Sequence, residues 1–304
     1  MRILLTLCCL VMLVSTTLGQ NLVVSPEKPS PGEQITFTYD KSDTPLAKEK
    51  KIEAIAYLCG MEGLPTAVEI DLMADGNKLK GKLNTEKETR AVFIVFKDLK
   101  GETVDNNEDK GYKAKMYKAD KSQIAQGTYA TLAGAYSSYG SIMELQRDPA
   151  KGIKYYQKEL KYYPESKTDI LNAYASAAAR SKDEAAIANV KSLLEELKTK
   201  RKATEDDRML TYRVSKTIKD EAGAEAIATK LRKKYKKGQL VKSDEEQAFY
   251  KEKDLAKKAV LFEAFKKKYA GTEKLDNWLS NMAYRMVAAY GRENKWDEFN
   301  TYLS

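Results

Sequence analysis

The chain has 304 residues, with 53 basic and 44 acidic side chains and a formal net charge of +9 at pH 7. It contains no histidine. This excludes Ser-His-Asp and Cys-His nucleophiles, histidine-ligated metals and the commonest general base. Carboxylate or lysine chemistry stays formally open, but no pair of carboxylates at a telling spacing supports it. We therefore expect this chain not to be an enzyme.

Residues 1–19 have the organisation of a secretory signal peptide. One basic residue, Arg2, precedes an apolar run from Ile3 to Val14, and small and polar residues follow up to Gly19. The run is shorter than the roughly 20 apolar residues of a membrane-spanning helix, and no later segment approaches that length. We expect an exported protein, periplasmic or extracellular, without a membrane span.

Removal of this segment would take Cys8 and Cys9 with it and leave Cys59 as the one cysteine of the mature chain. The mature chain could then form no internal disulfide, despite oxidising surroundings. Cys59 ends the apolar segment Ile52–Cys59, which has the pattern of a central strand. We expect a small buried core residue there; the alternative is a reactive or intermolecular thiol.

Residues 20–118 predict an all-β domain in which basic and acidic residues nearly balance. The expected strands are Leu22–Ser25, Glu33–Tyr39, Ile52–Cys59, Thr66–Met73, Lys78–Leu83, Ala91–Phe96 and Gly111–Tyr117. Short strands separated by turn signals such as Asp75-Gly76-Asn77 are typical of an immunoglobulin-like β-sandwich, here without its disulfide.

Residues 119–304 carry most of the positive charge and change to the period of helices. The expected helices are Gln126–Leu145, Pro149–Tyr162, Lys167–Arg180, Asp183–Lys200, Glu205–Lys219, Ala222–Tyr235, Glu245–Tyr269 and Lys274–Glu293. The segment Glu245–Tyr269 is long enough for two helices. Pro149 suits a first helical turn, and Ser181 or Asp183 suits a helix cap.

The second helix of each expected pair recurs at intervals of roughly 34 to 37 residues. The recurring segments end at Tyr163, Lys198, Tyr235 and Tyr269, and one more step lands near Leu303. This pattern resembles the tetratricopeptide repeat in its length and in its alternation of small and large residues. Because a repeat array covers its apolar face by stacking, we expect it to be truncated at Ser304, before a capping helix.

Helical arrays of this kind commonly bind peptides or partner domains, and a basic groove would favour acidic segments. The basic runs 198–202, 232–237 and 266–268 are expected at helix ends, where solvated lysines favour the helix dipole. The simpler interpretation of these runs is therefore structural. Nucleic-acid binding would use the same lysines, but export argues against it. We expect a protein or peptide partner, no nucleic acid and no cofactor.

A family resemblance rests on four features of the sequence. They are the opening Val24-Ser-Pro-Glu-Lys-Pro-Ser-Pro-Gly-Glu33, the strand Ile35–Tyr39, the closing strand Gly111–Tyr117 and the helices that follow. Together they are similar to the N-terminal portion of exported TlpA-type thioredoxin-like proteins of Bacteroidetes, over most of the mature chain. The resemblance implies that the helices lead into a C-terminal thioredoxin domain whose Cys-x-x-Cys pair exchanges thiols and disulfides. This sequence has neither the domain nor the motif, so no catalytic, cofactor-binding or metal-binding residue is carried over.

Two functions follow as expectations. The first is the non-catalytic scaffold or docking portion of an exported thioredoxin-like protein, which predicts coding sequence beyond Ser304 and a fraying or self-associating end at Trp296, Phe299 and Leu303. The second is a self-contained exported binding protein that holds a peptide, glycan or envelope partner, which predicts a stable protein ending near Ser304.

Overall fold

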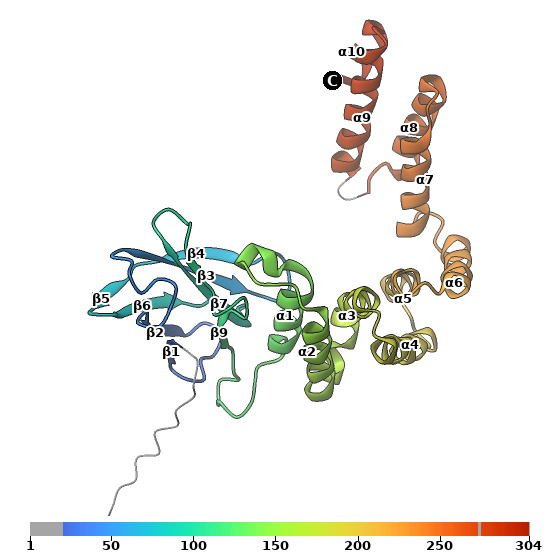
Figure 1. The fold of residues 1–304 in the computed structure, drawn as a ribbon. Coiled ribbons are helices and arrows are strands. Elements are labelled where there is room, and N and C mark those ends of the chain that lie inside the picture. Colours follow the sequence, from blue (N-terminus) through green and yellow to red (C-terminus); the bar gives the residue numbers. More distant parts are fainter. Residues whose placement is uncertain (1–20, 273–274, 304) are drawn as a thin grey trace, which may run out of the picture. The chain divides into compact units, whose positions relative to one another are not determined.

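The computed structural model describes residues 21–272 and 275–303, and the expected signal peptide lies outside them. The chain divides into two compact units, Met1–Ser166 and Lys167–Ser304. The first unit contains antiparallel sheets and the first helices, and the second contains the later helices (Figure 1). The prediction of a β domain followed by a helical array is confirmed.

Two antiparallel sheets form the β part of the first unit. One sheet has the order β1-β2-β6-β5 and contains Leu22–Ser25, Gln34–Asp40, Lys78–Asn84 and Met73–Asp75. The other has the order β4-β3-β7-β8 and contains Thr66–Ile70, Ile52–Cys59, Ala91–Asp98 and Val104–Asp105, while β9 (Tyr112–Lys115) also pairs with β7. This division of strands matches the two-sheet arrangement of immunoglobulin-like sandwiches.

The segment Thr66–Met73 differs from its prediction as one strand. It contains the end of β4 in one sheet and the start of β5 in the other. Ile70 is buried at the end of β4, whereas Met73 is exposed and lies opposite Lys80 of β6. The chain crosses between the sheets at this point, and a simple apolar pattern does not reveal such a crossing.

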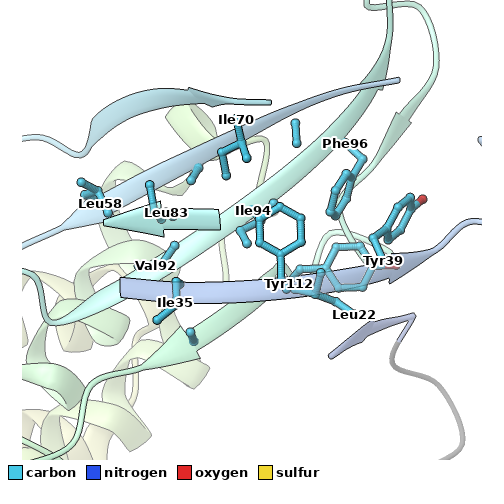
Figure 2. Packing of buried hydrophobic residues seen from close by; sticks show 14 of the residues in the cluster. Leu22, Ile35, Tyr39, Leu58, Ile70, Leu83, Val92, Ile94, Phe96 and Tyr112 are labelled. Atoms are coloured by element: carbon cyan, nitrogen blue, oxygen red, sulfur yellow. The ribbon is translucent and has the colours of Figure 1, made fainter. Parts of the chain in front are cut away.

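Aromatic packing joins the two sheets of the sandwich. Tyr39 of β2 stacks on Phe96 of β7, with ring centroids 3.7 Å apart and planes 8° apart. Tyr112 of β9 meets both rings edge-on, at 5.9 Å from Tyr39 and 5.8 Å from Phe96 (Figure 2). Burial of these large rings supplies cohesion between the sheets, and Cys59, the cysteine of the described residues, is free.

Helical segments follow the strands in the first unit, and the earlier ones cover the outer face of the β3–β7 sheet. They are α1 (Thr128–Gly134), the π-helical turn η1 (Ala135–Tyr139), the 3-10 turn η2 (Gly140–Met143), α2 (Pro149–Tyr162) and the 3-10 turn η3 (Pro164–Ser166). Leu132 and Tyr136 pack there against Phe93 and Val95 of β7. The opposite side of β7 faces the sandwich core, so this strand is buried on both faces, in agreement with its continuous apolar run.

The second unit consists of helical pairs in sequence. They are α3 (Lys167–Ser181) with α4 (Glu184–Lys198), α5 (Glu205–Thr217) with α6 (Glu221–Lys234), α7 (Gln239–Lys251) with α8 (Leu255–Tyr269), and α9 (Leu275–Arg292) with α10 (Trp296–Leu303). The segment Glu245–Tyr269 is thus two helices. None of the helices that the structure describes is long and apolar enough to span a membrane.

Aspartates in the short links begin several of these helices. Asp183, Asp220 and Asp254 accept hydrogen bonds of 2.9, 3.0 and 3.0 Å from the backbone N–H groups of the first turns that follow. The expected cap at Asp183 is confirmed. The break between α7 and α8 has the same cause, because Asp254 satisfies a backbone donor that a continuous helix would have paired internally.

Candidate docking surface

Cys59 is a core residue, as predicted. Its side chain is 1% exposed, and its sulfur lies 3.6 Å from the backbone oxygen of Tyr57 and 3.6 Å from the sulfur of Met143. Burial raises the pKa of the thiol to about 12. Since the thiolate is the nucleophile in disulfide exchange, the folded chain holds Cys59 in its unreactive form.

A hollow of about 680 Å³ lies at one end of the sandwich and includes Asp105, Asn107 and Tyr112 in its lining. The Asp105 carboxylate accepts hydrogen bonds from the hydroxyls of Tyr39 at 2.6 Å and Tyr112 at 2.9 Å. This buried acid therefore satisfies two buried tyrosines. Within the described part of the chain, no group of three or more cysteine or carboxylate side chains is placed to hold a metal ion.

Four tyrosines of the first unit form a continuous stack, here called the tyrosine stack: Tyr136, Tyr155, Tyr129 and Tyr162. Successive ring centroids lie 5.9, 6.2 and 5.9 Å apart, with planes 11°, 23° and 24° apart. The stack runs from a fully buried end at Tyr136, 1% exposed, to a solvent-facing end at Tyr162, 51% exposed.

The spacing along the helices explains this stack. Tyr155 and Tyr162 are seven residues apart on α2, which places them on one helix face two turns apart. Tyr129 and Tyr136 have the same separation across α1 and η1. Two pairs of equal spacing on neighbouring helical segments can interdigitate along their length.

Four lysines surround the tyrosine stack, and we call Lys113, Lys115, Lys151 and Lys158 the lysine group. Lys151 and Lys158 repeat the seven-residue spacing on α2. The ammonium of Lys151 lies 3.6 Å from the Tyr136 ring centroid, and that of Lys158 lies 5.6 Å from the Tyr155 centroid. These are cation–π distances.

The other two lysines come from β9, where side chains alternate between the two faces of the strand. Tyr112 and Ala114 point into the sandwich core, so Lys113 and Lys115 lie on the opposite face, toward the helices. The ammonium of Lys113 lies 6.0 Å from the Tyr136 ring centroid. The strand and the helix thus contribute equally to the lysine group.

None of the ion pairs recorded in the described part of the chain includes a member of the lysine group. Asp148 exerts a favourable field on Lys151, but its carboxylate caps α2 by accepting a 2.9 Å hydrogen bond from the Lys151 backbone N–H. The lysine group is therefore a concentration of positive charge without carboxylate partners.

This concentration is electrostatically unfavourable in the folded chain. Burial, together with repulsion from Lys151 and Lys115, lowers the pKa of Lys113 to about 8. Burial and the charge of Lys158 lower the pKa of Lys115 as well. For Lys151, burial and Lys110 lower the pKa while Asp148 opposes them. An anion placed among these ammonium groups would reverse the repulsive part of each shift.

The basic runs of the helical half occupy different positions from the lysine group. They lie in or just after the last turns of α4, α6 and α8, which confirms the helix-end interpretation. Several of their members are paired: Lys198 contacts Glu195 at 2.7 Å, and Arg232 contacts Asp244 at 2.7 Å.

The repeat-equivalent tyrosines also have a packing role. Tyr163 and Tyr269 are buried, and Tyr235 is half-buried against the cluster that contains Leu231 and Leu240. Tyr163 additionally donates a 2.5 Å hydrogen bond to the backbone oxygen of Ile124. These rings complete the ends of helices, as expected from their positions in the repeat.

The second unit contains two further hollows. One of about 180 Å³ between α4, α5 and α6 includes Lys198, Arg208 and Lys230 in its lining. The Nε of Arg208 is buried and has no hydrogen-bond partner among the described residues. The other hollow, of about 420 Å³, is bordered by Phe262 and Tyr302 together with residues of α9.

The end of the array is only partly covered. Phe299 and Tyr302 are half-buried against the aromatic cluster of α7 to α9, while Trp296 is 56% exposed. The side chain of Leu303 lies outside the described residues. The structure therefore gives two of the four terminal apolar side chains an intramolecular packing site.

Sequence reasoning sought a binding surface on the helical half and missed the lysine group. The usable signals were the alternating lysines of the segment Gly111–Tyr117 and the shared seven-residue spacing of tyrosines and lysines. Comparison of the sequence with models of known protein families and with curated proteins finds no match.

Proposed function

We propose that this chain is the non-catalytic scaffold and docking portion of an exported protein of the thioredoxin-like, thiol-disulfide oxidoreductase family. Thiol exchange would belong to a separate redox domain. The family assignment comes from the resemblance carried by the opening segment Val24–Glu33 and the closing strand Gly111–Tyr117. The observation that carries the docking role is the lysine group, whose four ammonium groups converge without carboxylate partners.

The state of Cys59 supports the non-catalytic part of the proposal. A cysteine that starts thiol exchange has a lowered pKa and an accessible sulfur. Cys59 is buried, and its pKa is raised to about 12. Any redox partner would therefore use the chain as a surface and would not exchange electrons with it.

A self-contained exported binding protein is the second candidate function. The hollow lined by Lys198, Arg208 and Lys230 favours it, because this hollow offers a second polar recognition point in the helical unit. In this case the lysine group and the helical unit would engage an envelope partner directly, without a redox domain.

Insulin reduction by the purified chain tests the non-catalytic assignment. With dithiothreitol as electron source, we expect the rate of insulin precipitation to equal the rate without protein, in both the unchanged chain and Cys59→Ala. Faster precipitation that Cys59→Ala abolishes would contradict the proposal.

The mass and location of the native protein separate the two candidates. A product of the envelope fraction that continues into a Cys-x-x-Cys-bearing domain would establish the scaffold role. A mature product whose mass corresponds to this chain alone would favour the binding protein, and retention of the precursor in the cytoplasm would contradict export in both.

A further inference from the structure

We infer that the lysine group and the tyrosine stack together form a docking site in the first unit for an acidic peptide segment of a partner protein. The inference deepens the proposed function by naming the partner chemistry and the surface. It places docking at β9 and α2, and not in the groove of the helical repeats.

The geometry of the site suits carboxylates carried on a flexible chain. Lys113 and Lys115 are alternate residues of a strand, and Lys151 and Lys158 are two turns apart on a helix, so the ammonium groups form two separated rows. Asp and Glu side chains along an extended segment can reach both rows. At the solvent-facing end of the tyrosine stack, the exposed ring of Tyr162 offers an apolar contact.

A purely structural role explains these lysines less well. Lysines often protect an edge strand from pairing with another chain. Full solvent exposure would serve that purpose, but Lys113 and Lys115 are half-buried among other cations. Cation–π contact alone also does not explain the positions of the four lysines, because only Lys151 among them approaches a ring closely, at 3.6 Å. The contacts of Lys113 and Lys158 with the stack are 5.6 to 6.0 Å long.

The chemistry of the site favours a peptide over an anionic glycan. Sugar recognition combines a free aromatic face with carboxylates or amides that bind hydroxyl groups. Here the faces of Tyr129, Tyr136 and Tyr155 are occupied by neighbouring rings or by lysines. Asp148, the carboxylate acting on Lys151, is engaged at the start of α2.

Fluorescence anisotropy with a labelled oligoglutamate peptide tests the site in the full mature chain. We compare the unchanged chain with a variant carrying Lys113→Gln, Lys115→Gln, Lys151→Gln and Lys158→Gln. The matched control carries Lys50→Gln, Lys51→Gln, Lys82→Gln and Lys87→Gln, which removes the same charge from exposed positions of the same unit. We expect about tenfold weaker binding in the first variant and little change in the control.

Proton uptake supplies a readout that general electrostatic attraction would not reproduce. Because the pKa of Lys113 is lowered to about 8 by burial, Lys151 and Lys115, a bound carboxylate should raise it. Peptide binding at pH 8, measured calorimetrically in buffers of different ionisation enthalpy, should therefore take up protons. Lys113→Gln should abolish most of that uptake while amide exchange shows the unit folded.

Three results would overturn the inference: equal weakening in both quadruple variants, no binding to the unchanged chain, or tighter binding of an oligouronate than of the peptide. The last result would assign the surface to an anionic glycan. Failure here leaves the insulin result unaffected, so the docking site and the non-catalytic assignment are tested separately.

Discussion

The carboxylate of Glu159 on α2 accepts a 2.7 Å hydrogen bond from the backbone N–H of Gly127, the residue that begins α1. Its second oxygen accepts a 3.2 Å hydrogen bond from the N–H of Ala130 in the first turn of the same helix. Gly127 has no side chain with which to cap α1. A side chain from the next helix therefore performs the capping, which ties α1 to α2 beside the tyrosine stack.

Replacement of Glu159 should destabilise the first unit. Glu159→Ala leaves two buried backbone donors unpaired, and we expect a loss of about 3 kcal/mol. Both tryptophans, Trp278 and Trp296, lie in the other unit, so the measurement is hydrogen exchange of the α1 amides. Glu165→Ala, at an exposed position, is the control. Unchanged protection of Gly127 and Ala130 would contradict the capping role.

The same carboxyl group should make stability depend on pH. Burial raises the pKa of Glu159 above 4.5, while the hydrogen bonds from Gly127 and Ala130 oppose this shift. Between pH 4.5 and the raised pKa, the folded unit binds more protons than the unfolded chain. The contribution of Glu159 to the free energy of unfolding therefore falls as pH rises through this window. Glu159→Gln should remove that component from a series of unfolding measurements across pH 4 to 7.

Lys113 should lower stability at neutral pH, as expected if it serves the proposed docking site. Lys113→Met removes a charge repelled by Lys115 and Lys151, and we expect a gain of about 1–3 kcal/mol at pH 7. Between pH 8 and 10.5 the unfolded chain holds the proton more strongly than the folded one, so the unchanged chain becomes more stable with rising pH and the gain shrinks. Amide exchange of β9, measured at pH 7 and again between pH 8 and 10.5, gives the gain in stability under each condition.

Lys154→Met is the matched control, because Lys154 is on the same helix, α2, and its side chain is exposed. It should leave stability within about 0.5 kcal/mol of the unchanged chain. An equal gain in both variants would show that added apolar surface, and not relief of repulsion, is responsible.

Gly81 should be intolerant of a side chain. A Cβ atom there would lie 2.4 Å from Cζ of Phe37 and 2.9 Å from Cγ2 of Ile70, inside the sandwich core. We expect Gly81→Ala to destabilise the first unit by about 1–3 kcal/mol. Lys82→Ala, at the next and exposed position of β6, should cost much less. Equal effects in urea unfolding followed by far-UV circular dichroism would refute this steric account.

Thr204 should contribute a helix cap in the second unit. Thr204 and Asp207 form a reciprocal capping box at the start of α5, and hydrogen bonds from Thr204 and Lys200 hold the pKa of Asp207 below 3.8. Thr204→Ala should cost about 1 kcal/mol, measured by urea unfolding with tryptophan fluorescence. Thr217→Ala, in the last turn of α5, should be nearly neutral.

The local sequence was sufficient for most of the strands and helices, although not for the crossing from β4 to β5. Alternating residues at Ile35, Phe37 and Tyr39 predict β2 and its buried face, and Asp183 predicts the start of α4, because side-chain period and capping act over a few residues. The break at Asp254 follows the same local rule. The missing histidines likewise exclude several chemistries without reference to any fold.

The lysine group required the tertiary structure. Lys113 and Lys151 are far apart in the chain, and each alone has the pattern of a solvated surface residue. Their approach depends on the pairing of β9 with β7, on the packing of α1 and η1 against the outer face of that sheet, and on the packing of α2 against α1 and η1. The burial of these lysines and the repulsion between them arise only when the folded chain brings β9 and α2 together. Sequence periodicity therefore identified the elements but not the site between them.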